Sequence, residues 1–160
     1  MIAINDTLPD IELTVMQDGK PTPVNTGKFF ADKRVILTAI PGAFTPTCSA
    51  KHLPSYIEQI EKLRSRGLTV VFVAVNDIFV LDAWRKSENA PDDIVFLADG
   101  NAELTSALGL ELDATGFGMG MRSKRYALYA ENGKVKGLWV EAPGEFRVSA
   151  AEAVLKALPN

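Results

Sequence analysis

The chain has 160 residues, of which 47% are hydrophobic, and a formal net charge of −3 with acidic and basic residues interspersed. This apolar content suffices for a single domain, residues 1–160, to bury a core. The composition gives no electrostatic case for nucleic-acid binding, and no apolar run approaches the ~20 residues that a membrane span needs.

The first thirty-odd residues are predicted to form a β-hairpin extension. Residues 11–15 alternate apolar and polar side chains, as a half-buried strand does. A turn at residues 18–20 leads into residues 21–25, whose two prolines indicate a short edge strand. No basic stretch followed by an apolar core opens the chain, so we expect no secretory leader.

The only cysteine of the sequence lies at a predicted strand-to-helix junction. Residues 35–40 form a β-branched apolar run that is short enough for a buried strand. After the junction, apolar residues recur at helical spacing up to about Arg66, and Gly67 closes the helix. Cys48 is therefore expected in or near the first turn of this helix.

Strands and helices continue to alternate downstream, and the order predicts an α/β fold with a mixed central sheet flanked by helices. The turn pair Asn-Gly indicates a hairpin, and a capping-box pattern indicates the start of a last helix. The expected ranges are 68–75 and 94–97 for strands, 78–87 and 102–108 for helices, 125–130 and 134–140 for the hairpin, and 149–158 for the last helix. Residues 109–121 are expected to form a glycine-rich loop.

A cysteine at the start of a helix has chemical consequences. The first N–H groups lack intrahelical partners and the helix dipole is positive there, so an anion is stabilised. Helix N-termini and nearby cations favour the nucleophilic thiolate form of a cysteine. Thr45 stands three residues earlier, where its hydroxyl could donate to the sulfur or to a substrate oxygen. The alternative is that Cys48 is an inert, small hydrophobe, which is the commoner fate of a lone cysteine.

The sequence around this cysteine resembles a known active-site signature. Residues 41–49, Pro-Gly-Ala-Phe-Thr-Pro-Thr-Cys-Ser, are similar to the signature of peroxiredoxins of the type II, or fifth-class, branch. The likeness continues in order, over nearly the whole chain, at residues 52–54, 75–80, 97–100 and 122–127. The resemblance implies a thioredoxin-like fold and a thiol-dependent peroxidase that reduces hydrogen peroxide and alkyl hydroperoxides.

The resemblance also implies roles for individual residues. Cys48 would be the peroxidatic cysteine, Thr45 would help to hold the peroxide, and Pro41 would shield the sulfur. The family's catalytic arginine stands directly before an aromatic residue, which is Arg125 here. Arg122 is the second choice, and spacing alone does not separate the two. A guanidinium suits this role because it stays charged and offers several donors, although a single arginine is more often a solvated surface charge.

His52 lies one helical turn after Cys48, so the two side chains can share a face. We expect a local polar contact that helps to tune the sulfur. A protease-type Cys–His pair is conceivable, but no residue that would orient the imidazole is identifiable. One cysteine and one histidine without further ligands do not make a zinc site, so neither a metal nor a cofactor is expected.

Residues 116–120 read Gly-Phe-Gly-Met-Gly, which superficially suggests a dinucleotide-binding loop. Such a loop must lead from a strand into a helix, whereas this one precedes a strand, so we reject that interpretation. We expect a flexible rim of the active site instead. The resemblance implies that Phe44 and Phe117 contact substrate there, and that Phe44 and Phe79 line the pocket or a dimer contact.

Many members of this family carry a second, resolving cysteine, often in the segment that corresponds to residues 143–149, and this sequence has none. The resemblance therefore implies an external thiol reductant, glutathione/glutaredoxin or thioredoxin, and also a homodimer. A lone cysteine fits a reducing compartment, so a cytoplasmic protein is expected. Two alternatives stay open: a peroxide sensor or redox relay that uses the same site, and an interaction module whose cysteine is incidental.

Overall fold

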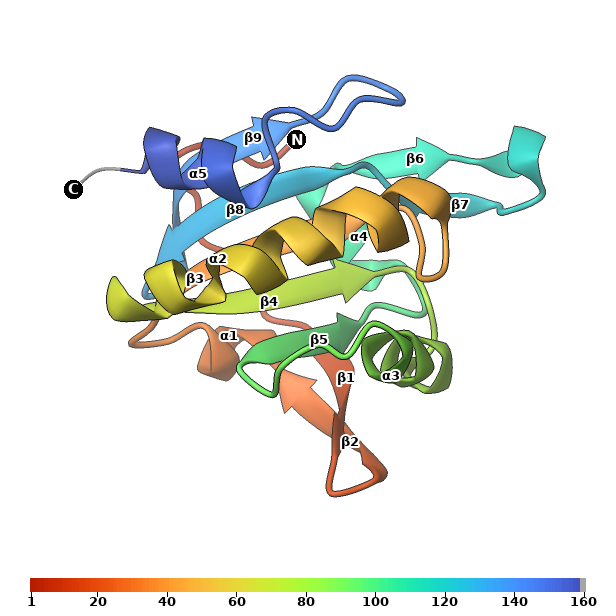
Figure 1. The fold of residues 1–160 in the computed structure, drawn as a ribbon, viewed down its shortest axis with the longest axis horizontal. Coiled ribbons are helices and arrows are strands. Elements are labelled where there is room, and N and C mark those ends of the chain that lie inside the picture. Colours follow the sequence, from red (N-terminus) through yellow and green to blue (C-terminus); the bar gives the residue numbers. More distant parts are fainter. Residues whose placement is uncertain (159–160) are drawn as a thin grey trace.

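The computed structural model describes residues 1–158, which are arranged around a mixed seven-stranded sheet (Figure 1). The strand order is β2-β1-β5-β4-β3-β8-β9, in which β3, β4 and β5 run parallel and the outer strands pair antiparallel. The smaller second sheet pairs β6 with β7. The strands are β1 (Glu12–Gln17), β2 (Lys20–Asn25), β3 (Arg34–Ile40), β4 (Leu68–Ala74), β5 (Ile94–Ala98), β6 (Glu111–Asp113), β7 (Met121–Ser123), β8 (Tyr126–Glu131) and β9 (Lys134–Val140).

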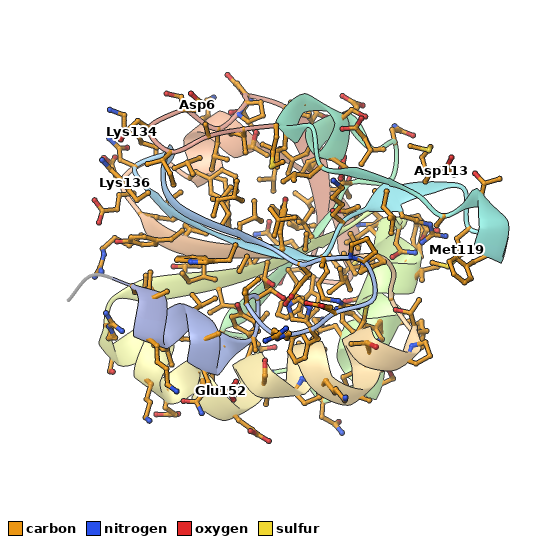
Figure 2. The ribbon with its side chains drawn as sticks, turned by 90° about the horizontal axis from the view of Figure 1, so that it is seen from above. Asp6, Asp113, Met119, Lys134, Lys136 and Glu152 are labelled. Carbon is orange, nitrogen blue, oxygen red and sulfur yellow. The ribbon has the colours of Figure 1, made fainter. Side chains whose placement is uncertain are left out.

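Helices cover both faces of the large sheet. The long α2 and the C-terminal α5 lie in front of it in Figure 1, and α1 and α4 lie behind. Figure 2 shows the same layering, with Glu152 of α5 on one side of the sheet and Asp6 on the other. The helices are α1 (Thr26–Phe29), α2 (Leu53–Ser65), α3 (Ile78–Ser87), α4 (Glu103–Leu108) and α5 (Ala151–Ala157), with a π-helical turn η1 (Cys48–His52) and a 3-10 turn η2 (Thr115–Phe117).

The central strands are buried on both faces, so alternate residues enter two separate cores. In β4, Phe72 belongs to the core under α2, α3 and α5, whereas its neighbours Val71 and Val73 belong to the core under α4. The near-continuous apolar runs of β3 and β4 follow from this two-sided burial. Among residues 1–158, no helix is both long and apolar enough to cross a membrane.

The structure confirms the predicted α/β class, the N-terminal hairpin with β2 at the edge, and the hairpin around Asn132 and Gly133. The predicted helix over residues 78–87 is α3 with the same bounds. Gly67 and Gly109 both have positive φ (+74° and +69°) and follow the ends of α2 and α4, as a helix-terminating glycine does.

Two local expectations differ from the structure, and one short helix was not expected. The prediction of a loop for residues 109–121 is wrong, because Glu111–Asp113 and Met121–Ser123 pair as strands around η2. The four-residue α1 was not predicted at all; the Asn25 side chain caps it by accepting the Lys28 N–H. The capping box at residues 149–152 is also wrong, because the Ser149 hydroxyl donates to Glu141 and Ala150 is the residue that precedes α5.

Candidate active site

The loop that carries the cysteine leaves β3 at the edge where the parallel strands end. The Ala43 N–H donates to Asn76 Oδ1 at 2.9 Å, and Asn76 follows the neighbouring strand β4. Within the loop, the Thr45 hydroxyl donates to the Gly42 carbonyl at 2.6 Å. These bonds tie the loop to the adjacent strand end and fix its shape before the helix begins.

Gly42 leaves room for side chains that pack against this loop. A Cβ at this position would lie only 3.1 Å from Arg122 Nη1 and 3.3 Å from Thr45 Cγ2. Arg122 itself donates to the carbonyls of Met119, at 2.9 Å, and Val75, at 3.2 Å. Arg122 therefore joins the β6–β7 hairpin to the end of β4 and supports the loop.

Helical backbone begins at Pro46 and passes through the π-turn η1 before α2. In this turn the Leu53 N–H donates to the Cys48 carbonyl, five residues back. Pro54 explains the wider turn, because proline lacks an N–H and its ring would clash with the Ala50 carbonyl in a regular α-helix. Cys48 thus lies in the first turns of the helix, as predicted from the sequence.

Arg125 is the arginine that reaches the sulfur. It stands directly before β8, and strand alternation directs its side chain to the face of Ala127 and Tyr129, which α2 covers. Its Nη2 donates to Cys48 Sγ at 3.2 Å. Cys48 is a free cysteine with 0% of its surface exposed, so the pair is shielded from bulk water. The guanidinium therefore places a positively charged donor directly on the sulfur.

His52 holds the other half of the same guanidinium. Arg125 Nη1 lies 2.7 Å from His52 Nδ1, and because arginine only donates, this ring nitrogen must be the acceptor. The proton of the neutral ring therefore sits on Nε2, which donates to Thr38 Oγ1 at 2.6 Å, and Thr38 donates onward to the Tyr126 carbonyl. Burial, reinforced by the Arg125 charge, holds the pKa of His52 well below its usual value.

An aromatic layer supports the site from the sheet side. Phe72 of β4 packs edge-on against His52, with ring centroids 5.4 Å apart, and also contacts Tyr56 and Trp84. The buried indole of Trp84 donates to Ser49 Oγ at 3.0 Å, one residue after the cysteine. The position of His52, and through it that of Arg125, is therefore set by packing as well as by hydrogen bonds.

Phe146, in the segment that follows β9, lies against the same pair. Its ring centroid is 5.1 Å from that of His52 and 5.9 Å from the Arg125 guanidinium carbon. The segment predicted from the family to carry a resolving cysteine in many members therefore contributes an aromatic side chain here.

The structure brings Cys48 and His52 each into direct contact with Arg125 and places the other predicted residues around them less closely. The Thr45 hydroxyl proton is engaged by Gly42, so it does not reach the sulfur as a donor here. Pro41 is half-buried at the end of β3. Phe44 is exposed and has a positive φ of 64°.

Phe117 lies in η2, at the outer end of the β6–β7 hairpin, where Figure 2 shows Asp113 and Met119. It is 86% exposed, so the structure shows no enclosed substrate pocket around it. Its predicted contact with substrate stays a prediction.

Sequence reasoning missed Thr38, Asn76 and Phe146 as parts of this site. Thr38 carried a signal, because it is the one hydroxyl in the apolar run of β3 and a buried hydroxyl needs a partner. Asn76 stands two residues after the buried strand β4, in the turn that leads to α3. Phe146 lies in an irregular segment and carried no periodic signal.

The described residues contain no cluster of metal-ligating side chains, and the main surface hollow lies away from the sulfur. Within residues 1–158, no group of three His, Cys, Asp or Glu side chains is placed to hold a metal ion. A surface hollow between the β1–β2 turn, α3 and β5 is lined by Met16, Asp18 and Arg85 and includes none of the residues around Cys48.

The chain matches the family model described as Redoxin over residues 3–155. It is 46% identical over 159 residues to Peroxiredoxin-2C of Oryza sativa subsp. japonica, covering 98% of both chains. It is 47% identical to Peroxiredoxin-2E-2, chloroplastic, of the same plant, covering 98% of this chain and 72% of that protein.

Among solved structures, reduced Prx3 of Vibrio vulnificus in complex with H2O2 superposes with a TM-score of 0.94 at 47% identity, covering 98% of this chain and 99% of that one. A thioredoxin-like sheet with a lone cysteine at a helix start, hydrogen-bonded to an arginine, defines a thiol-dependent peroxidase. The chain belongs to the redoxin family and, within it, to the type II peroxiredoxins.

Proposed function

We propose that this chain reduces hydrogen peroxide and alkyl hydroperoxides in a one-cysteine cycle in which Cys48 is oxidised and an external thiol restores it. The observation that carries the proposal is the 3.2 Å hydrogen bond from Arg125 Nη2 to Cys48 Sγ inside a buried site. Such a contact stabilises the thiolate, which is the form of cysteine that attacks a peroxide.

In the first half-reaction the Cys48 thiolate attacks the outer oxygen of ROOH, forms the S–O bond and breaks the O–O bond. The sulfur is oxidised to a sulfenic acid, and the leaving RO⁻ takes a proton and departs as an alcohol, or as water when the substrate is hydrogen peroxide. Negative charge moves from sulfur to the leaving oxygen. A guanidinium held in place beforehand can stabilise that charge as it moves.

Four further groups complete the proposed substrate site. The Thr45 oxygen keeps lone pairs that can accept the O–H of the hydroperoxide, because its own proton is donated to Gly42. The Cys48 N–H lies in the first turn of the helix, where backbone donors lack intrahelical partners. Pro41 would shield the sulfur from water. Phe44, which is exposed beside this loop, would contact the organic part of a larger hydroperoxide.

In the second half-reaction an external thiol R′SH attacks the sulfenic acid, giving a Cys48–S–S–R′ disulfide and water. A second R′SH then releases Cys48 as the thiol and leaves as R′SSR′. Cys48 is the only cysteine of the 160 residues, so an intramolecular disulfide cannot form. We propose glutathione with glutaredoxin, or thioredoxin, as the reductant, because both supply the required thiol chemistry in a reducing compartment.

The proposal includes a homodimer, and its support is a set of large apolar side chains that are exposed. Phe44, Phe79, Phe117 and Met121 are each at least half exposed, and they come from the cysteine loop, the first turn of α3 and the β6–β7 hairpin. Exposed apolar surface of this kind marks an interface. Sedimentation should show a dimer that Phe79→Glu dissociates, whereas Ile4→Glu, at an exposed apolar position near the N-terminus, should leave it intact.

Removal of hydroperoxides would serve antioxidant defence and redox homeostasis, and we propose the cytoplasm as the compartment. The support is the single free thiol, since a chain without disulfides suits reducing surroundings. Cell fractionation with an antibody to this chain tests the location directly; recovery in an oxidising compartment would contradict it.

The peroxidase proposal is tested by mixing reduced protein with one equivalent of hydroperoxide in a stopped-flow instrument. The mass of the intact chain is then measured by mass spectrometry. We expect rapid peroxide loss and one added oxygen on Cys48, and neither in Cys48→Ser. Arg125→Lys should slow the step on the order of 10²-fold, because an ammonium cannot bind the sulfur and His52 together in one planar fork. A wild-type rate no faster than that of an ordinary exposed thiol would refute the proposal. Fast oxidation that neither glutathione with glutaredoxin nor thioredoxin reverses would favour the sensor or relay alternative.

A further inference from the structure

The segment after β9 covers the arginine–histidine pair through a single side chain. In this cover segment (residues 142–149), Phe146 packs on His52 and Arg125, whereas residues 142–145, 147 and 148 are mostly exposed. A turn in which the Glu145 N–H donates to the Ala142 carbonyl is a local contact and does not hold the segment to the sheet. Something else must therefore hold Phe146 in place.

Glu141, the first residue after β9, supplies that attachment. Its Oε2 accepts from the Arg147 N–H at 2.7 Å, the Ser149 N–H at 2.9 Å and the Ser149 hydroxyl at 2.6 Å. Its own N–H donates to the Arg125 carbonyl at 2.9 Å. Glu141 therefore joins the backbone of the arginine that contacts the sulfur to Arg147 and Ser149, which follow Phe146 in the cover segment.

A buried carboxylate is costly, and a side chain that only fills space at this position would be apolar. Glu141 is 7% exposed, and its second oxygen, Oε1, is buried without a hydrogen-bond partner among the described residues. Burial alone would raise the pKa of this carboxyl, but the bonds from Ser149 and from the backbone of Arg147 and Val148 outweigh it and hold the pKa below its usual range. A charged group kept at this desolvation cost points to a function for its three accepted bonds.

We propose that Glu141 is a positioning residue. Its carboxylate holds the cover segment so that Phe146 packs on Arg125 and His52 during peroxide attack. When the cover segment detaches from Glu141, the oxidised Cys48 becomes exposed to the external thiol. The inference rests on the proposed function, because the attached and detached states of the cover segment are assigned to the two half-reactions of the peroxidase cycle. Phe146 restrains the guanidinium and excludes water in the first step. In the second, the sulfur has 0% exposure, so a thiol must first find an opening.

The two half-reactions should therefore respond in opposite directions when the attachment is removed. With Glu141→Ala, peroxide oxidation should slow about 10-fold as Arg125 loses its restraint, since small misplacements of a catalytic group cost 10- to 100-fold. Reduction of the preformed sulfenic acid by dithiothreitol should become several times faster. Glu141→Gln, whose amide oxygen can still accept, should fall between Glu141→Ala and the wild type in both steps.

Glu145→Ala is the matched control, because it removes the same charge from an exposed position of the same segment, and both rates should stay at wild-type values. A double-mutant cycle then tests whether Glu141 acts through the aromatic ring. In a Phe146→Ala background, Glu141→Ala should change neither rate by more than about twofold, because the two residues form one coupled unit.

The inference would be overturned if Glu141→Ala had its full effects in the Phe146→Ala background. It would also be overturned if Glu141→Ala alone slowed both half-reactions or changed neither rate. If Glu141→Ala does not fold, Ser149→Ala removes one of the three donors and should move both rates in the same directions by smaller factors. The wild-type oxidation rate separates the two proposals. A slow wild type refutes the peroxidase itself, whereas a fast wild type with additive variants refutes only the role of Glu141.

Discussion

At the scale of a single residue, the contact between His52 and Arg125 requires that Nδ1 of the imidazole carries no proton. Its Nδ1 accepts from Arg125, so the ring must be neutral for the contact to exist. A proton on that nitrogen would place two donors and two positive charges face to face. The low pKa of His52 follows first from burial and second from the positive charge of Arg125 that faces the ring.

The first prediction concerns stability against pH. An unfolded histidine gains its proton near pH 6.5, whereas folded His52 stays neutral to lower pH, so the unfolded state binds more protons in this window. The free energy of unfolding should therefore decrease as the pH falls below about 6.5, by up to ~1.4 kcal/mol per pH unit, until the folded pKa is reached. Urea titrations at several pH values between 7.5 and 5 measure this slope.

His52→Asn is the matched variant, because its amide oxygen can accept from Arg125 near the Nδ1 position without titrating. Buried or paired carboxylates such as Asp82 and Glu141, whose pKa values are lowered, also lose stabilisation as the pH falls, and they do so in both proteins. The difference between the two slopes isolates the histidine. Equal slopes would show that His52 does not titrate differently on folding.

Residue-level prediction from sequence reached the sulfur but not its surroundings. Cys48 at a helix start follows from local pattern alone, while the choice of Arg125 over Arg122 needed the face of the sheet on which α2 packs. Once that face is known, strand alternation directs Arg125 toward the cysteine, and Arg122 lies on the separate β6–β7 sheet. Phe146 depends on how an irregular segment folds back, for which no local rule exists.

At the scale of elements, the π-turn is the feature that sets the direction of the cysteine. An α-helix would bring each successive residue round by 100°, and one extra residue in the turn changes which side chains share a face. The turn coincides with the missing N–H of Pro54. A single proline six residues after Cys48 therefore affects the approach of the sulfur to Arg125.

Pro54→Ala should restore an N–H that can bond to the Ala50 carbonyl and let the α-helix extend toward Cys48. We expect peroxide oxidation to slow by about 10-fold or more, because the sulfur is displaced from Arg125. The free energy of unfolding should not decrease, since alanine is the better helix former. Stopped-flow kinetics and urea unfolding on the same sample measure both quantities.

Pro91→Ala, in the connection between α3 and β5, is the control for replacing a half-buried proline and should leave the oxidation rate unchanged. A Pro54→Ala protein with the wild-type rate would mean that the π-turn persists without its proline. A large loss of stability would mean that the turn is needed for folding and not only for alignment.

Long periodic elements were predictable because their own side chains define them. The buried strands and α3 each carry enough apolar residues to fix their type. The short elements were not predictable, because tertiary contacts determine whether they form. Of these, α1 has four residues, and β6 and β7 have three each. Ser149 illustrates the competition, since a pattern that suits a helix cap was overridden by a buried carboxylate.

At the scale of the whole molecule, one sheet separates two cores, and only one of them contains the site. The core under α2, α3 and α5 includes Cys48 and reaches His52 through Phe72. The core under α4 supports the same strands from behind. Stability should therefore depend on both cores, whereas the chemical step should respond to one.

Neighbouring residues of β4 test this division. Val71→Ala, in the core under α4, should lower the free energy of unfolding by about 1.5–3 kcal/mol and leave the oxidation rate of the folded protein unchanged. Phe72→Leu should cost a comparable amount, about 1–2 kcal/mol, and also slow oxidation severalfold, because it withdraws the ring that packs on His52. Denaturant titrations and single-turnover rates distinguish the two; equal kinetic effects would reject the division.

The hydrogen bond from the Trp84 indole to Ser49 places a fluorophore one residue from the sulfur that is oxidised. Adding oxygen to Cys48, or a bulky thiol in the next step, changes the electric field and the packing that the buried indole experiences. Indole emission is sensitive to both, so each chemical state of the cysteine should have its own intensity. The catalytic cycle can therefore be followed by intrinsic tryptophan fluorescence, without an added dye.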